Sequence, residues 1–318
     1  MKLFIIGNGF DIAHGINSKY SDFKKFLEEY EPLILESDMP DPVIYLKKGK
    51  LYCDSKNAAN IIWHLIDYAE RRLSANMDAE SIEWNYVEDA LGKLDYTLCF
   101  NKFGEGWDFE KDCIQSKWEF ALENQYRALQ IAAAVLQIHN FFDKWVNQIE
   151  TQKVKAKSDF KKLIDKNDIF INFNYTDVLE SIYKCKNIWH IHGRKGDKEI
   201  IFGHGNIDFD DNDYEQVLYG AAAVLENIHE ILYKDVRANI LRNVKQWENL
   251  KEVTSIYTYG FSYGYADRLY IQKIIKSCPN CKEWYIEGYP KVDEIEEYMN
   301  RVIDMGFNGR IKVFIIEN

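Results

Sequence analysis

The sequence lacks the excess of positive charge with which proteins hold a nucleic-acid backbone. Its 51 acidic residues outnumber its 40 Lys and Arg residues, which leaves a net charge of −11. Binding to phosphates releases condensed counterions and normally uses a basic face. Basic residues are scattered here, apart from a short mixed run between Lys153 and Lys166. We therefore expect no nucleic-acid partner.

Cysteine is also scarce, and its spacing does not form a complete metal site. Most of the six cysteines lie in apolar or helical stretches rather than in the loop-rich spacing of disulfide scaffolds. Cys278-Pro279-Asn280-Cys281 resembles half of a zinc knuckle, but a structural zinc site needs four ligands and no second pair occurs. We favour a turn with two ordinary thiols, a reduced compartment and no bound metal.

Long hydrophobic runs are absent as well. The apolar start from Leu3 to Ile6 ends at Gly7, which makes it too short for the core of a signal peptide. No apolar stretch approaches the length that crosses a bilayer. With 47% hydrophobic and 29% charged residues, the composition is that of a globular protein. We expect a cytoplasmic protein without membrane contact.

Short apolar runs, each followed by a glycine or a polar turn, recur along the chain. Near-continuous apolar runs are typical of strands buried on both faces of a mostly parallel sheet, which requires helices on both sides. The expected strands are Leu3 to Ile6, Ile169 to Phe173, Ile188 to Ile191, Ile200 to Phe202, Ser255 to Tyr259, Trp284 to Ile286 and Ile311 to Ile316.

Helical periodicity fills most of the remaining chain. The expected helices are Ser21 to Tyr30 with Ser21 as N-cap, Asp267 to Lys276, and Val292 to Met305 closed by Gly306. A long amphipathic stretch runs from Trp118 to Ile149 and continues more weakly to Ile164, and Asp213 to Leu250 is a further helical region. No clear strand occurs between the first one and residue 169. We therefore predict one α/β domain over residues 1–318. It is a Rossmann-like, doubly wound, mostly parallel sheet with a large helical insertion, approximately 24–165, after the first βα unit.

The first motif is the turn Gly7-Asn8-Gly9, directly after the first strand. Glycine lets the backbone turn sharply and lets a phosphate approach the amides. The next glycine, Gly15, follows Gly9 by six residues instead of three, and no acidic residue ends a second strand, so the dehydrogenase fingerprint is not met. A Walker pattern is missing too. The turn predicts a phosphate site, and a tight turn that needs glycine for geometry alone is the alternative.

The second motif, Asn172 to Glu180, follows the strand that starts at Ile169. Ligands bind at the carboxyl ends of strands in open α/β sheets, and the amide of Asn174 can hold a hydroxyl and a water. The alternative is a helix cap formed by Thr176 or Asp177.

The third motif is His190-Ile191-His192-Gly193. Strand alternation predicts His190 and His192 on one face, where His204 is the nearest candidate for a third metal ligand. A histidine before a glycine at a strand end also suits a general base, because it titrates near neutral pH.

The fourth motif is Gly260-Phe261-Ser262, again after a strand. Ser262 can bind phosphate or ribose, and Asp267 is expected mainly as a helix N-cap.

Together these motifs resemble the bacteriophage abortive-infection AbiH family over nearly the whole chain. The resemblance rests on Gly7-Asn8-Gly9-Phe10-Asp11 with Gly15 and Ile16, Trp84 to Leu91, Phe173-Asn174-Tyr175-Thr176, His190-Ile191-His192-Gly193, Gly203-His204-Gly205, and Gly260-Phe261-Ser262 with Asp267. That family in turn looks like a distant relative of the sirtuin-type NAD-binding fold.

The sirtuin resemblance implies roles for individual residues. Asn174 falls on the catalytic asparagine and His192 on the catalytic histidine, and Asp11 could stabilise an oxocarbenium ion. The resemblance places Gly7, Gly9 and Gly15 in the dinucleotide loop and Gly260 and Ser262 at the ribose and phosphate contact. Asn8, which replaces the alanine of sirtuins, and Tyr175, Gly193 and Asp267 are the other expected cofactor contacts. The chain has Asp11 where sirtuins have serine, Thr176 where they have the aspartate of Asn-x-Asp, and no zinc module.

These departures argue against protein deacylation and favour hydrolysis of the N-glycosidic bond of NAD or a related nucleotide. The alternatives are a non-catalytic sensor of NAD or ADP-ribose, and a metal-dependent nuclease or phosphatase that uses His190, His192 and His204. The expected ligand is a small nucleotide. The partners left open are a second copy of the chain and a phage-derived trigger.

Overall fold

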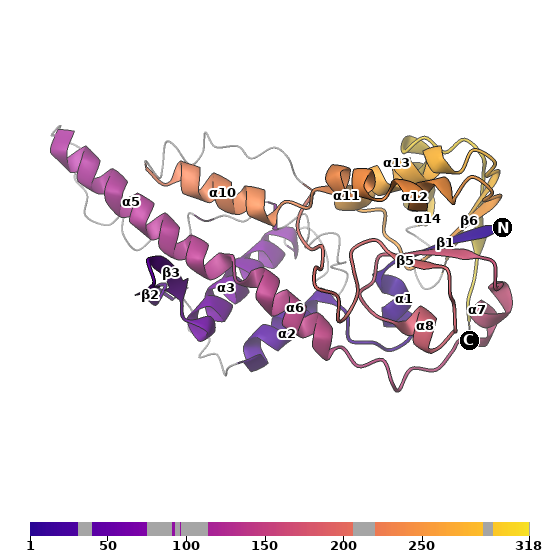
Figure 1. Ribbon diagram of the computed structural model, residues 1–318, viewed down its shortest axis with the longest axis horizontal. Coiled ribbons are helices and arrows are strands. Elements are labelled where there is room, and N and C mark those ends of the chain that lie inside the picture. The colour runs from indigo at the N-terminus through magenta and orange to yellow at the C-terminus, as the bar shows by residue number, and fades with distance from the viewer. Residues whose placement is uncertain are drawn as a thin grey trace.

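The computed structural model describes residues 1–30, 40–74, 91–92, 96, 114–205, 220–288 and 295–317. A six-stranded sheet lies at one end of the molecule, and an arm of helices extends away from it (Figure 1). The predictions on 84–90, on 206–219 and on 292–294 lie outside the described residues, as do Cys99 and Cys113.

All five strand pairs in the large sheet are parallel, and the spatial order is β5-β4-β1-β6-β7-β8. The chain builds outward from β1 to β5 on one side and then returns beside β1 to build β6 to β8 on the other. Such a reversal leaves a crevice at the carboxyl ends of the central strands. The strands are β1 (Lys2–Ile6), β4 (Ile169–Asn172), β5 (Ile188–His190), β6 (Ser255–Tyr259), β7 (Glu283–Glu287) and β8 (Arg310–Phe314).

The first strand shows why the sheet is buried on both faces. Its side chains alternate, so Phe4 and Ile6 enter one hydrophobic cluster, and Leu3 and Ile5 enter the other. All four are fully buried, and each such side chain stabilises the fold by about 1.5–3 kcal/mol. The doubly buried parallel sheet predicted from the apolar runs is confirmed.

Short helices cover the Phe4 face of the sheet. They are α1 (Asn8–Ala13), α7 (Ser158–Leu163) and α8 (Val178–Ser181). The opposite face is covered by α11 (Val236–Arg242), α12 (Val244–Glu248), α13 (Arg268–Ser277) and α14 (Ile295–Asp304). Gly306 follows α14 with φ of 104°, as predicted for its closing glycine.

The arm contains the described helices of the predicted insertion except α7, which lies on the sheet, together with one later helix. It comprises α2 (Tyr20–Tyr30), the hairpin β2 (Ile44–Lys47) and β3 (Lys50–Cys53), α3 (Ser55–Ser74), α5 (Ile114–Val135), α6 (Ile138–Gln148) and α10 (Ala222–Leu232). Helix α10 packs along α5 although about ninety residues separate them in the sequence. The described residues of the arm share the hydrophobic cluster of the Phe4 face.

Two local predictions are wrong, and a third differs from the structure in part. Helix α2 begins at Tyr20, so Ser21 is not its N-cap, and the carboxylate of Asp22 accepts the Lys19 N–H at 2.7 Å. Ile200 to Phe202 forms no strand. An apolar residue is needed at Phe202 because its buried ring stacks on that of Phe142 in α6, with the ring centroids 3.9 Å apart.

The third difference concerns the amphipathic stretch from Trp118 to Ile149, which is helical but is not one continuous helix. It is broken at Leu136 and Gln137, where the chain passes from α5 to α6. The Gln137 side chain donates to the Cys53 carbonyl at 2.9 Å, which ties this break to the β2–β3 hairpin.

Candidate functional site

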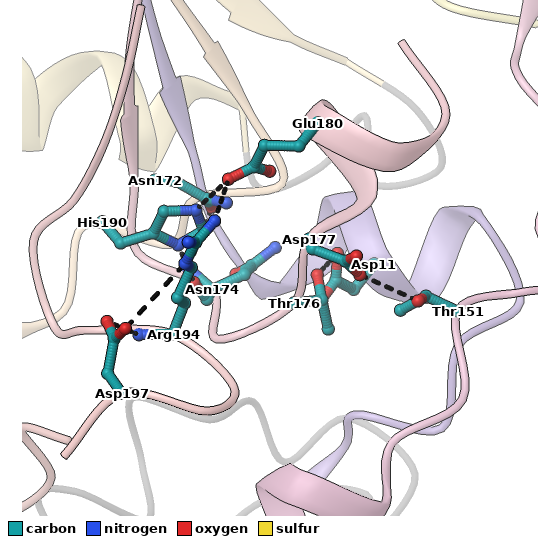
Figure 2. Close-up of polar contacts among 10 residues, drawn as sticks. All are labelled: Asp11, Thr151, Asn172, Asn174, Thr176, Asp177, Glu180, His190, Arg194 and Asp197. Atoms are coloured by element: carbon teal, nitrogen blue, oxygen red, sulfur yellow. Dashed lines mark hydrogen bonds and ion pairs between the residues drawn. The ribbon is translucent and has the colours of Figure 1, made fainter. Parts of the chain in front are cut away.

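The polar motifs predicted from the sequence gather at the carboxyl ends of β1, β4, β5 and β6. They form two groups of side chains. The first group surrounds Asn174 and Asp11 (Figure 2), and the second consists of His192, Asp267 and Lys234.

Glycines let the turns after β1 and β6 pack backbone against backbone. The Gly7 N–H donates to the Tyr259 carbonyl at 3.0 Å, and the Gly9 N–H donates to the Gly260 carbonyl at 2.9 Å. A Cβ on Gly260 would lie 2.1 Å from the Phe10 nitrogen, and one on Gly7 would lie 2.4 Å from the Gly260 oxygen. These glycines are required by the crossing of the two turns, and the two N–H groups point at carbonyls of the protein.

The other residues of the first glycine motif have different surroundings. The Asn8 side chain accepts a hydrogen bond from the Ser18 hydroxyl at 2.7 Å, which fastens the start of α1 to the loop after it. Gly15 has φ of 72° and open space around its Cβ position, so its backbone conformation is what favours glycine there.

Asn174 connects the ends of β1 and β4. It is 4% exposed, its amide donates to the Gly7 carbonyl at 2.9 Å, and its own N–H is accepted by the Asn172 side chain at 3.0 Å. The side chain and the backbone of Asn174 are thus each held by a hydrogen bond. The structure therefore fixes the side chain predicted as the catalytic asparagine.

Asp11, a residue of α1, lies beside Asn174 and is buried. The Thr176 hydroxyl lies 2.8 and 3.0 Å from the two carboxylate oxygens. Burial raises the pKa of Asp11 to about 7, although the hydrogen bonds from Thr176 and Asn174 oppose the shift. At neutral pH this carboxyl group can both give and take a proton. Figure 2 shows the pair next to Asn174.

His190 lies on the other side of Asn174. Its Nδ1 is 3.1 Å from the Asn174 carbonyl oxygen, and its Nε2 is 2.8 Å from Glu180 of α8. Burial alone would raise the pKa of Glu180, but the hydrogen bond and charge of His190 and the charge of Arg194 outweigh it and lower the pKa. Arg194 also pairs with Asp197, so an ion network closes this side of the group.

His192 belongs to the second group, in which three titratable side chains meet out of water. Its Nε2 is 3.4 Å from Asp267, and the Lys234 ammonium donates to the same carboxylate oxygen at 2.8 Å. The Lys234 side chain has no exposed surface. Burial and the charge of Lys234 lower the pKa of His192, so its ring is neutral at pH 7. Burial alone would raise the pKa of Asp267, but the charge of Lys234 outweighs it and lowers the pKa.

Two of the predicted helix caps use their side chains elsewhere. Asp267 stands at the N-cap position of α13 and Asp177 at that of α8, but neither carboxylate makes a capping hydrogen bond. Asp267 binds Lys234 instead, and Asp177 accepts the Thr151 hydroxyl at 2.8 Å. In both cases a tertiary partner replaces the local cap.

The remaining predicted contacts lie around the same edge. The Tyr175 hydroxyl donates to the Ile201 carbonyl at 2.9 Å, and a Cβ on Gly193 would lie 2.6 Å from the Glu199 oxygen. Ser262 follows the Gly260 turn, where its carbonyl accepts a hydrogen bond from Arg301 at 2.8 Å.

The three histidines considered as metal ligands have three different partners. His190 contacts Glu180, His192 contacts Asp267, and Nε2 of His204 lies 3.0 Å from the His229 carbonyl. Strand β5 ends at His190, so the alternation that predicted a shared face does not extend to His192. Within the described ranges, no group of three or more potential ligands is placed to hold a metal ion.

The site is completed by Lys234 and Thr151, to which the sequence did not point, and by Glu180, which ended the second motif without an assigned role. Lys234 lies in a region predicted only as helical, and a single lysine carries no motif. Its role depends on α10 returning to the sheet beside the His190 motif, which is a tertiary arrangement.

The model of the family described as bacteriophage abortive infection AbiH matches residues 3–287. The chain belongs to the AbiH family. Membership implies a role in bacteriophage abortive infection, and the AbiH resemblance predicted from the motifs is confirmed. Comparisons with curated proteins and with solved structures find no match. In the described part of this AbiH chain, no helix is long and apolar enough to cross a membrane.

Proposed function

We propose that this AbiH protein binds NAD or a related nucleotide at the carboxyl edge of its sheet and hydrolyses the N-glycosidic bond. The observation that carries the proposal is the meeting of Asn174 with Asp11 at the end of β1 and β4, next to a neutral buried histidine group. Numbered along the chain, the sheet has the order 3-2-1-4-5-6, which is common among dinucleotide-binding sheets.

Each group has a part in the proposed reaction. The nicotinamide leaves with the bonding electrons, positive charge develops on the ribose, and water supplies the new oxygen. Asn174 orients the ribose hydroxyls and the water. His192 is neutral and accepts the proton, and Asp267 stabilises the resulting imidazolium. Asp11 in its ionised form supplies negative charge near the ribose.

The test follows nicotinamide release from NAD by the purified full chain. We expect release by the wild type and a loss of at least about a hundredfold in Asn174→Ala and in His192→Ala. The matched control is Asn249→Ala, at the exposed end of α12, which should keep the wild-type rate. Thermal melting of each variant separates loss of chemistry from loss of fold. Equal rates in the wild type and His192→Ala would contradict the mechanism.

The second candidate is a sensor that binds a nucleotide without cleaving it. It is favoured by the internal contacts of the catalytic candidates, since Thr176 holds Asp11 and the Gly7 carbonyl holds Asn174. Calorimetry with ADP-ribose and NAD distinguishes the two. A sensor binds at least one of them tightly and returns NAD unaltered.

A further inference from the structure

A cationic hollow lies between the end of α1 and the segment that leads into α7. Its volume is about 490 Å³, and its lining includes His14, Lys153, Lys155, Lys157 and Ser158. This volume is in the range of small-molecule sites. The site residues discussed above do not line it.

The backbone of this lysine segment is fixed by hydrogen bonds. The Lys157 N–H donates to the Tyr183 hydroxyl at 2.7 Å, and the Thr151 hydroxyl donates to Asp177 at 2.8 Å. Val154 packs against the hydrophobic cluster between these two points. The lysines are therefore presented by an ordered segment, and a ligand does not have to order the backbone.

The imidazole ring of His14, which lines the hollow, is neutral. Its Nδ1 lies 2.7 Å from the Phe10 carbonyl, which only accepts, so Nδ1 carries the hydrogen. Nε2 is then left to accept from the Tyr183 hydroxyl at 2.6 Å, which in turn accepts the Lys157 N–H. Burial lowers the pKa of His14, in agreement with a neutral ring. The positive charge of the hollow therefore comes from the lysines.

The lysine charges are poorly balanced within the protein. Lys153 pairs with Glu150 at 3.6 Å. Both side chains are largely exposed, and exposed ion pairs contribute little to stability. In the described part of the chain, Lys155 and Lys157 make no ion pair. Asp159, the next acid along, is engaged by Lys162 at 3.2 Å. In a protein of net charge −11, this leaves a local excess of positive charge facing an open hollow.

We propose that this hollow is an anion site for a small molecule that bears two or more phosphates. Lysine ammonium groups on flexible stems bind phosphates as point charges, and three of them match an oligophosphate better than a single phosphate. The acidic charge of the whole molecule opposes a long nucleic-acid ligand, whose further phosphates would meet acidic surface. The lining shares no residue with the two polar groups at the carboxyl edge, so the proposal stands independently of the proposed hydrolysis.

Calorimetry with inorganic tripolyphosphate tests the proposal on the full chain. We expect binding by the wild type that weakens as salt increases, and at least about tenfold weaker binding by the double variant Lys155→Gln/Lys157→Gln. The matched control is Lys47→Gln/Lys50→Gln on the exposed β2–β3 hairpin, which makes the same change in charge and should bind as the wild type does.

Three results with these proteins would overturn the proposal, and a fourth comes from the His192→Ala variant. The three are no binding by the wild type, an equal loss in both lysine pairs, and binding of a single-stranded oligonucleotide more tightly than tripolyphosphate. The His192→Ala variant locates the ligand. It should bind tripolyphosphate normally, and a loss of binding there would place the anion at the carboxyl edge and overturn the separate site. If the protein does not hydrolyse NAD, the expected results of the tripolyphosphate titrations stay the same.

Discussion

Asp11 and Thr176 contact each other at the carboxyl edge of the sheet. The sequence offered them separately, Asp11 as a carboxylate beside the first glycine turn and Thr176 as a possible helix cap. In the structure the Thr176 hydroxyl donates to the buried carboxylate. The two residues therefore form one polar pair whose members come from different elements.

The pKa of Asp11 predicts a pH dependence of stability. Folding raises this pKa from 3.8 to about 7, so between those values the folded protein holds a proton that the unfolded chain has lost. The stabilisation is complete below about pH 4 and is lost as the pH rises through about 7. We expect Asp11→Asn to flatten the fall in the free energy of unfolding over this range, as measured by urea denaturation.

The exposed Asp304→Asn provides the control for that measurement and should keep the wild-type slope. If the slopes of all three proteins agree, Asp11 does not titrate as the structure indicates.

For single residues, the sequence predicted which side chains lie at the site, but it did not predict the residues that each of them contacts. Asn174, His192 and Asp11 were named from strand ends and resemblance, because strand ends meet at one edge. Their partners were not predicted. Thr176 was expected as a cap, and Lys234 carried no pattern, since hydrogen bonds between distant segments leave no local periodicity.

Where the turns after β1 and β6 cross, the packing of the two elements leaves no room for a side chain at Gly260. Gly260 has φ of 62°, and its Cβ position lies against the backbone of Gly9 and Phe10. Gly15 has a similar φ of 72° but open surroundings. A substitution at Gly15 therefore measures the free-energy cost of the backbone conformation alone. A substitution at Gly260 adds the cost of the steric clash.

We expect Gly15→Ala to lower the free energy of unfolding by about 1–2 kcal/mol, the cost of a left-handed conformation for alanine. Gly260→Ala should cost clearly more, because the added methyl group must push two strand ends apart. Chemical denaturation of both variants measures the difference. Equal losses would mean that the crossing has room to relax.

The elements that the sequence predicted correctly are those with a continuous apolar pattern. The runs at Leu3, Ile169 and Ser255 became central strands because burial on both faces requires apolar residues at every position. Phe202 shows the limit of that argument. A buried ring stacked on a helix leaves the same apolar signal as a strand residue. The β2–β3 hairpin was not predicted, since its exposed side chains break the alternation.

For the molecule as a whole, the important contact is between α5 and α10. A Cβ on Gly220, just before α10, would lie 2.4 Å from the Ala121 carbonyl of α5. This close approach fixes where α10 begins along the arm. Helix α10 ends at Leu232, and Lys234 of the buried ion group follows two residues later.

We expect Gly220→Ala to loosen α10 and to disturb His192 at the other end of the connection. Hydrogen exchange in α10 should become about tenfold faster, which corresponds to roughly 1.4 kcal/mol. The NMR signal of the His192 ring should shift at the same time. Gly49→Ala, at an open turn with φ of 73°, provides the matched control. A change in α10 without a change at His192 would show that the two move independently.

The position of Lys234 links the arm directly to the buried ion group at the edge of the sheet. Only Tyr233 separates this lysine from the last residue of α10. Burial lowers the pKa of His192 and the charge of Lys234 lowers it further, while the same charge outweighs burial at Asp267 and lowers the pKa of that carboxyl group. A protein that displaced α10 along α5 would draw the lysine away from its carboxylate, and His192 would then gain a proton more readily. Contact made on the arm would thus change the protonation of a histidine at the edge of the sheet.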